Sequence, residues 1–356
     1  MRRSNRLSDW IRLGRVETNP ATLTRGRVDH VIIIDGSMSS LRTGFETNAG
    51  ILYKLLCEAA LSRRLSLRYE AGIQWHRWHS FRDVLEGRGI NRQIRRAYGF
   101  LASRYRPGDR IFLFGYSRGA YAVRSLAGVI DRVGLLRAEH ATVRNIREVY
   151  RHYQNGGDSM PATEFQVLKC HPKTLIELVG VWDTVRALGL RVPVLWRWSP
   201  EPQQFHNHAL GHHIAHGFQA LALDETRNAY APVLWECREG WPGRLEQVWF
   251  RGTHGDVGGH LKGFIAARPL SNIPLLWMLE RAAMCDLPLP EGWRDRFAQD
   301  VTAPSVGNTR GWAKLFLSRR RRIPLTDPSE SLHVTVQPSG PICGKPSDPK
   351  PATAAK

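Results

Sequence analysis

The sequence predicts an α/β fold, with a mostly parallel β-sheet and helices on both of its faces. Largely apolar segments typical of strands occur at residues 30–34, 111–114, 174–182 and 245–250, and Val31 to Ile34 are all β-branched. Because this first run does not alternate with polar residues, its strand is expected to be covered on both faces, as in a parallel sheet. Segments with a helical spacing of apolar residues separate the strands, and this alternation favours the same architecture.

The expected elements follow one another along the chain, each with its own local signal. The first strand ends in a polar turn at Asp35 and Gly36, and residues 47–62 place one isoleucine and several leucines on one helical face. The turn Arg106-Pro107-Gly108-Asp109 precedes the strand at 111–114, and an apolar helical stripe follows it over 120–133. The remaining expected elements are a strand at 65–69, helices at 88–105 and 140–155, a His-rich helix before Ala220, and a helix at 272–286.

Length and composition indicate one large domain with less regular ends. A chain of 356 residues, 42% of them hydrophobic, can bury a full α/β core. We expect a basic N-terminal lead-in over residues 1–28, a catalytic domain over 29–325 with a cap or lid insertion at 186–217, and a flexible C-terminal tail over 326–356. The tail is rich in Pro, Ser, Lys and Ala, a composition typical of disorder.

The chain lacks the apolar segments that direct proteins into or across membranes. No apolar run approaches the ~18 residues that span a bilayer, and no apolar h-region follows the basic N-terminus as in a signal peptide. Five scattered cysteines without C-x-x-C spacing fit reduced thiols. We therefore expect a cytoplasmic location in the producing cell, with peripheral membrane association.

The net charge of +19 indicates an anionic partner or a general arginine bias of the source organism. Only Arg319 to Arg322 form a continuous basic run. No zinc-finger spacing and no aromatic RNA-binding motif occur, which argues against nucleic acid. For a hydrolase, an anionic membrane surface is the better match to this charge.

The most informative motif is Gly115-Tyr116-Ser117-Arg118-Gly119, which follows a predicted strand and precedes a predicted helix. In a G-x-S-x-G turn of this kind, the serine sits on a sharp bend whose neighbours must be small. The bend lifts the serine hydroxyl into a cleft beside a helix N-terminus, where a developing oxyanion is favoured. Ser117 is therefore the candidate nucleophile.

Polar residues suited to catalysis come directly after four predicted strands, at Asp35, Ser117, Asp183 and His254. The carboxyl ends of parallel strands meet at one edge of a sheet, so these residues are expected to converge there. Serine, acid and histidine occur in the chain order of α/β hydrolases, and the sequence thus predicts an α/β-hydrolase fold.

The chemistry assigns a role to each of these residues. His254 would take the proton of Ser117 as general base, and Asp183 would orient the imidazole. Asp256, two residues from His254, is the alternative acid. The backbone N–H of Arg118 and an N–H near Asp35 and Gly36 would form the oxyanion hole.

Histidines and cysteines give no metal-site pattern. His206, His208, His212, His213 and His216 include pairs at i and i+4, but no glutamate completes an H-E-x-x-H motif. A solvated or core-facing helix is the simpler interpretation of this cluster. We expect neither a metal nor another cofactor.

Several motifs together resemble the bacterial α/β-hydrolase family that includes the catalytic domains of type VI-secreted phospholipase effectors. The matching segments, within roughly 28–290, are Asp35-Gly36, 108–109, 115–121, 180–185, 220–225 and 247–259. The sequence departs from the family pattern at 37–39, at Gln219 and at His260. The resemblance implies a triad of Ser117, Asp183 and His254, phospholipid ester hydrolysis in at least some relatives, and delivery through a secretion apparatus with an immunity protein as a further partner.

The leading hypothesis is a serine hydrolase that cleaves acyl esters through an acyl-enzyme, like a phospholipase or lipase. Two alternatives stay open: a small-molecule esterase or thioesterase without a membrane role, and a non-catalytic basic binding protein. The substrate class is therefore a phospholipid or another acyl ester.

Overall fold

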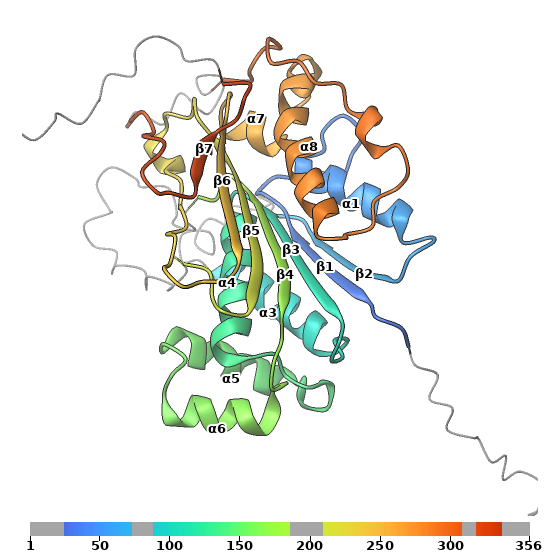
Figure 1. Cartoon of the computed structure of the whole chain (residues 1–356), viewed down its shortest axis with the longest axis vertical. Coiled ribbons are helices and arrows are strands. Elements are labelled where there is room, and N and C mark those ends of the chain that lie inside the picture. The colour runs from blue at the N-terminus through green and yellow to red at the C-terminus, as the bar shows by residue number, and fades with distance from the viewer. Residues whose placement is uncertain (1–24, 73–87, 186–208, 308–317, 337–356) are drawn as a thin grey trace, which may run out of the picture.

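The computed structural model describes residues 25–72, 88–185, 209–307 and 318–336 of the chain. Its centre is a seven-stranded sheet in the order β2-β1-β3-β4-β5-β6-β7, and every neighbouring pair is parallel (Figure 1). The strands are β1 (Asp29–Ile34), β2 (Leu65–Glu70), β3 (Arg110–Tyr116), β4 (Ile176–Trp182), β5 (Ile214–Ala222), β6 (Arg244–Phe250) and β7 (Glu330–Leu332). The predicted parallel α/β-hydrolase class is confirmed by this sheet and its helices.

Helices cover both faces of the sheet. On one face lie α3 (Arg88–Ala102) and α4 (Arg118–Val133), with α5 (Val143–Gln154) and α6 (Met160–Lys169) packed on these helices. On the other face lie α1 (Asn48–Ala59), α7 (His254–Gly258) and α8 (Arg268–Met284) (Figure 1). Short 3-10 turns are η1 (Ala138–His140), η3 (Asn228–Tyr230), η4 (Ile265–Ala267) and η5 (Trp293–Arg296).

Alternation along the strands divides the core into two layers. In β1 and β3, Ile32 and Leu113 pack toward α3 and α4, whereas Val31 and Phe112 pack toward α1 and α8. Successive strand residues point to opposite faces, so a strand buried on both sides must be apolar throughout. This requirement produces the continuous apolar runs from which the strands were predicted.

One expectation about an element is wrong, and helix α6 and strand β7 were not expected. The His-rich segment ends not in a helix but in β5, where Gln219 occupies a sheet position at which neighbouring polar side chains bond to it. Strand β7 (Glu330–Leu332) lies within the range expected to be a tail, and it pairs with β6.

Parts of three predicted segments lie outside the described residues. These parts are 1–24 of the lead-in, 186–208 of the cap or lid, and 337–356 of the tail. Within the cap range, residues 214–217 already belong to β5.

A topological switch point lies between β1 and β3. The chain runs from β1 to β2 on one side of β1 and then returns to form β3 on its other side. Ligands of open α/β sheets bind beyond the carboxyl ends of strands at such a point. Ile34, Gly115, Val181, Gln219 and Gln247 lie in one register row across five strands. The residues just beyond this row therefore share one edge of the sheet.

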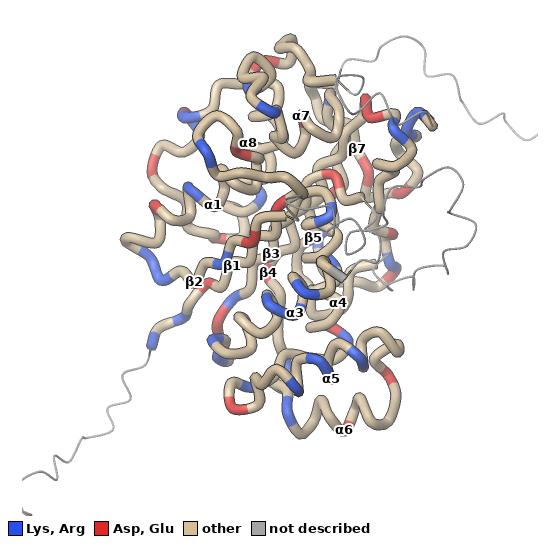
Figure 2. The backbone as a smooth tube through the Cα atoms, turned by 180° about the vertical axis from the view of Figure 1, so that it is seen from behind, with Lys and Arg blue, Asp and Glu red and all other residues tan. Residues whose placement is uncertain are grey.

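Two further properties bear on the expected partners. Among the described helices, none combines the length and apolar character needed to cross a bilayer. Figure 2 shows Lys and Arg spread over the strands and helices of both layers, with Asp and Glu between them. Within the described residues, the positive charge is thus distributed rather than gathered in one stripe.

Candidate active site

Ser117 occupies the sharp turn between β3 and α4. Its backbone angles, φ 58° and ψ −123°, lie where residues with side chains rarely occur. The two glycines of the motif are required by close packing: a Cβ on Gly115 would lie 2.7 Å from the Ala120 backbone, and one on Gly119 would lie 2.1 Å from the Ile34 carbonyl oxygen. The local sequence thus builds the bend that the G-x-S-x-G pattern predicts.

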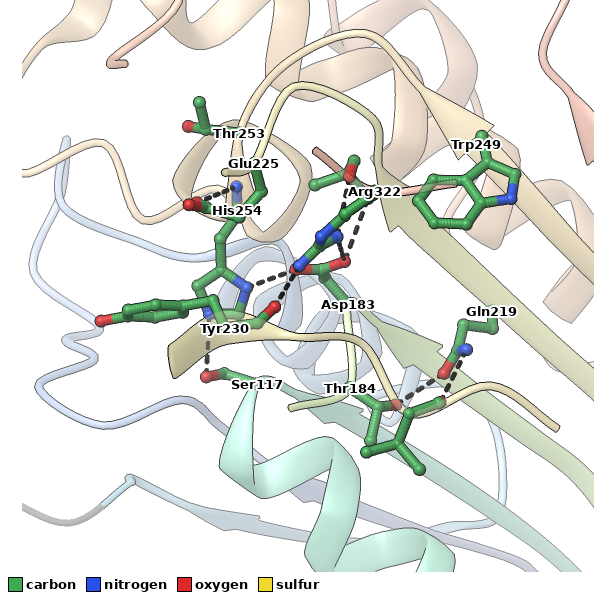
Figure 3. Close-up of polar contacts among 12 residues, drawn as sticks. Ser117, Asp183, Thr184, Gln219, Glu225, Tyr230, Trp249, Thr253, His254 and Arg322 are labelled. Carbon is green, nitrogen blue, oxygen red and sulfur yellow. Dashed lines mark hydrogen bonds and ion pairs between the residues drawn. The ribbon is translucent and has the colours of Figure 1, made fainter. Parts of the chain in front are cut away.

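Ser117, His254 and Asp183 form one chain of hydrogen bonds (Figure 3). The distance from His254 Nε2 to Ser117 Oγ is 2.9 Å, and the distance from His254 Nδ1 to Asp183 Oδ2 is 2.6 Å. Because an ionised carboxylate only accepts hydrogen bonds, Nδ1 carries the proton and Nε2 is left to accept from the serine. All three residues are buried, with Asp183 fully so.

Aromatic and acidic groups hold the His254 ring in place. Tyr116 stacks on the imidazole with a centroid distance of 4.9 Å, and Tyr230 lies 4.8 Å away. The Glu225 carboxylate accepts a hydrogen bond from the His254 backbone N–H at 3.2 Å. Burial lowers the pKa of His254, and the Asp183 carboxylate partly opposes this shift. A neutral imidazole at neutral pH is the state that a general base needs.

Asp183 is held by more than its histidine. Its Oδ1 accepts from the Ala222 backbone N–H at 3.0 Å, and both carboxylate oxygens accept from Arg322. Burial alone would raise the pKa of Asp183, but the Arg322 guanidinium and the His254 bond together keep it well below its usual value. Asp183 is therefore ionised at every pH at which the fold is expected to function.

The turn after β1 lies beside the nucleophile. A Cβ on Gly36 would lie 3.4 Å from the Ser117 Cβ, which shows how closely this backbone approaches. The Gly36 N–H donates to the Asp35 carboxylate at 2.6 Å, and Thr47 Oγ1 and Tyr69 OH donate to the same carboxylate. Burial raises the pKa of Asp35, and these donors oppose the shift. Asp35 thus shapes the turn, and the Gly36 N–H is engaged with it.

Arg118 contributes its backbone to the same region. It is the first residue of α4, where the N–H groups of the opening turn have no partner inside the helix. The positive end of the helix dipole coincides with these groups. This is the position expected for an oxyanion donor.

Asp256, the alternative acid, lies in α7 and faces a different set of donors. Its carboxylate accepts from the Thr253 backbone N–H at 2.7 Å, from the Val306 N–H at 2.8 Å, and from the hydroxyls of Thr253 and Ser305. These bonds tie the His254 loop to residues 305–306. Of the two candidate acids, Asp183 is the one bonded to the imidazole.

Two residues close to the site were not anticipated in this role. Arg322 belongs to the basic run noted in the sequence, but its partner Asp183 is 139 residues away. Glu225 pairs with Arg227 and accepts a hydrogen bond from the His254 backbone N–H. Nothing in local spacing identifies either contact.

The histidine cluster forms no metal centre within the described residues. His213 pairs with Asp131 at 3.1 Å, and His216 in β5 lies 3.9 Å from Glu177. His206 and His208 are outside the described residues. Among those that are described, no three His, Cys, Asp or Glu side chains are grouped so as to hold a metal ion.

Comparisons with known proteins give one family match. Residues 29–281 match the family described as "T6SS, Phospholipase effector Tle1-like, catalytic domain". An uncharacterized protein of Saccharomyces cerevisiae is 27% identical over 237 residues, which are 60% of this chain and 33% of the yeast protein. The chain thus spans about a third of the length of that curated relative (33%).

Two solved structures are also similar. The crystal structure of an uncharacterized protein from Pseudomonas aeruginosa has a TM-score of 0.44 and 14% identity, covering 77% of this chain and 49% of that chain. The structure of the Tle1 effector bound to the VgrG spike from the Type 6 secretion system has a TM-score of 0.35 and 18% identity, covering 66% of this chain and 51% of that chain.

Proposed function

Because this chain belongs to the family of Tle1-like phospholipase effector catalytic domains of type VI secretion, we propose that it is a serine hydrolase that cleaves the acyl esters of phospholipids. The observation that carries the proposal is the continuous hydrogen-bonded chain from Ser117 Oγ through His254 to Asp183. Such an arrangement activates a serine for attack on an acyl carbon.

The reaction proceeds in two halves. Ser117 Oγ attacks the acyl carbon while His254 Nε2 accepts its proton, and the carbonyl oxygen becomes an oxyanion. The tetrahedral species collapses to an acyl-enzyme as the imidazolium returns the proton to the departing alcohol. Water, deprotonated by His254, then attacks the acyl-enzyme, and the imidazolium returns that proton to Ser117 Oγ as the ester bond breaks and the fatty acid leaves.

The oxyanion is proposed to lie between α4 and the turn after β1. The Arg118 N–H supplies one donor at the helix N-terminus. The neighbouring turn approaches Ser117 closely at Gly36, although the Gly36 N–H itself bonds to Asp35. Asp183, rather than Asp256, is proposed as the acid of the triad.

A surface beside this edge fits an anionic membrane. Phe45, in the loop after β1, and Ile265, in the loop after α7, are 39% and 53% exposed. The two loops pack together, since the Arg268 side chain bonds to the Glu46 and Gly259 carbonyls. Exposed Arg42 lies over the Phe45 ring at 5.1 Å, and Lys262 is exposed nearby. Apolar side chains flanked by cations suit an interface with anionic lipid.

Delivery by a type VI secretion apparatus is proposed from family membership. The Tle1 effector of the solved complex is bound to a VgrG spike, and an equivalent partner, with an immunity protein, is proposed for this chain.

The test is product analysis with the purified chain on vesicles of phosphatidylethanolamine and of phosphatidylglycerol. We expect fatty acid release by the wild type and a loss of about 10⁴-fold or more in Ser117→Ala, because the covalent step is removed. Undiminished release by Ser117→Ala would overturn the serine mechanism. Turnover of soluble esters without release from either vesicle would favour the small-molecule esterase, and turnover of neither would favour a binding protein.

A further inference from the structure

We propose that Arg322 is a positioning residue of the active site, which fixes the Asp183 carboxylate and balances its charge beside His254. The inference rests on the proposed function, since it takes Asp183 and His254 as members of a catalytic triad. Arg322 lies beyond residues 29–281, the segment that matches the family.

Arg322 and Asp183 form a bidentate ion pair, in which both Nη atoms of the guanidinium bond to the carboxylate. Arg322 Nη1 lies 2.5 Å from Asp183 Oδ1, and Nη2 lies 3.0 Å from Asp183 Oδ2. The same two nitrogens donate to the carbonyl oxygens of Ala222, at 2.7 Å, and of Tyr230. The Arg322 side chain is only 4% exposed. Two parallel N–H to oxygen bonds fix the rotation of a carboxylate as well as its charge, and only arginine makes them.

Arg322 approaches from a segment fastened at both ends, which we call the C-terminal strap (residues 318–332). At its start, the Ser318 carbonyl accepts from the Asn228 N–H at 3.0 Å, and the Arg320 N–H donates to Thr226 at 2.8 Å. At its end, β7 pairs with β6, and the Glu330 carboxylate accepts from Trp249 Nε1 at 2.7 Å. The strap therefore holds Arg322 over Asp183 in advance of any substrate (Figure 3).

The charges around His254 come in balanced pairs. Asp183 is paired with Arg322, and Glu225, which holds the His254 backbone, is paired with Arg227 at 2.6 Å. Among the described residues, the titratable and charged groups near His254 are Asp183, Glu225, Asp256, Arg227, Arg322, Tyr116, Tyr230 and His260. If Arg322 is removed, one buried carboxylate beside the imidazole is left without its counter-charge. That negative charge would stabilise the imidazolium and make His254 more basic.

The experiment compares Arg322→Gln and Arg322→Lys with Arg321→Gln, a matched control in the same basic run whose side chain is exposed. The measurements are kcat/KM for a soluble p-nitrophenyl ester across pH and the thermal midpoint of each full-length variant. We expect Arg322→Gln to lower kcat/KM about tenfold to a hundredfold. We also expect its acidic limb to move to higher pH by on the order of one unit.

The lysine variant separates orientation from charge. Arg322→Lys keeps the positive charge but loses the bidentate hydrogen bonds. Its kcat/KM should therefore fall, while the acidic limb of its pH profile stays near that of the wild type. Arg321→Gln should match the wild type in both. An Arg322→Gln enzyme with wild-type rate and pH profile would overturn the proposal, even if its thermal midpoint falls, because a purely structural role predicts that outcome. Should Arg322→Gln fail to fold, wild-type turnover by Arg322→Lys would overturn it.

The proposal and the function beneath it fail in different ways. If the wild type hydrolyses no ester and its Ser117 is not labelled by a fluorophosphonate, the serine mechanism is wrong. If the wild type is active and labelled but the Arg322 variants behave like it, only the role of Arg322 is wrong.

Discussion

Replacing Asp183 with Asn separates the two candidate acids, because it should damage both turnover and stability. The amide cannot accept from the imidazole and from a guanidinium as a carboxylate does. His254 would lose the partner that selects its tautomer, which costs about 10³- to 10⁴-fold in kcat when the geometry is otherwise kept. The substitution is nearly isosteric, so no cavity adds to the effect.

Asp183→Asn should also lower the stability of the fold, because it removes the anionic partner of the Arg322–Asp183 ion pair. Arg322 is 4% exposed and Asp183 is fully buried, so Asp183→Asn leaves a buried cation without its carboxylate. Breaking such a pair costs about 3–5 kcal/mol. The guanidinium keeps its bonds to the Ala222 and Tyr230 carbonyls, which favours the lower end. At about 2 °C per kcal/mol for a domain of this size, the thermal midpoint should fall by about 6 °C.

The assay pairs kcat/KM for a soluble ester with thermal unfolding, and Asp256→Asn is the control. Asp256 accepts bonds that tie the His254 loop to residues 305–306, so its loss should lower stability while leaving folded enzyme active. Ser117→Ala should abolish turnover at nearly unchanged stability. Wild-type turnover by Asp183→Asn, or loss of turnover confined to Asp256→Asn, would refute the assignment of the acid.

Three further predictions follow from the same site. The acidic limb of kcat/KM should have its midpoint below 6.5, because burial lowers the pKa of His254 and the base must be neutral; a pH profile with a limb above 6.5 would contradict this. Gly119→Ala should lower the free energy of unfolding by about 1–3 kcal/mol and reduce fluorophosphonate labelling of Ser117, since the new Cβ would lie 2.1 Å from the Ile34 carbonyl oxygen. Unaltered unfolding and labelling would show that the turn is not closely packed. Phe45→Ser combined with Ile265→Ser should reduce binding to phosphatidylglycerol vesicles in a sedimentation assay while soluble-ester turnover stays unchanged, and equal binding would remove this surface from the proposal.

Most strands could be predicted because burial in the sheet requires apolar residues within the strand itself, and these are visible in the local sequence. Helices cover both faces of β1 and β3, so the side chains on both faces must be apolar. This is why the continuous apolar runs in the sequence predict these two strands. The family resemblance, based on motifs at strand ends, is confirmed by the match over residues 29–281. Ser117, Asp183 and His254 lie together because parallel strands end at the same edge.

β5 escaped prediction partly because the hydrogen-bond partners of its buried Gln219 are distant in sequence. Gln219 is fully buried, yet its side chain bonds to Thr184, Gln247 and the Val233 carbonyl. Burying a polar side chain that has all of these partners costs little stability. A prediction from apolar patterns, however, treats a polar residue as evidence against a buried strand. The bonds cross from β4 to β6, so no window of local sequence contains them.

Arg322 illustrates a limit of a different kind. Four consecutive arginines look alike in sequence, and their number suggested only an affinity for anions. The strap turns one of the four inward onto Asp183 and leaves its neighbour Arg321 exposed. Serine, acid and histidine lie within residues 29–281, but the counter-charge of the acid comes from beyond them. The motifs therefore predict the candidate catalytic groups, whereas the ion pair that Asp183 makes with Arg322 is formed by a later segment that no motif marks.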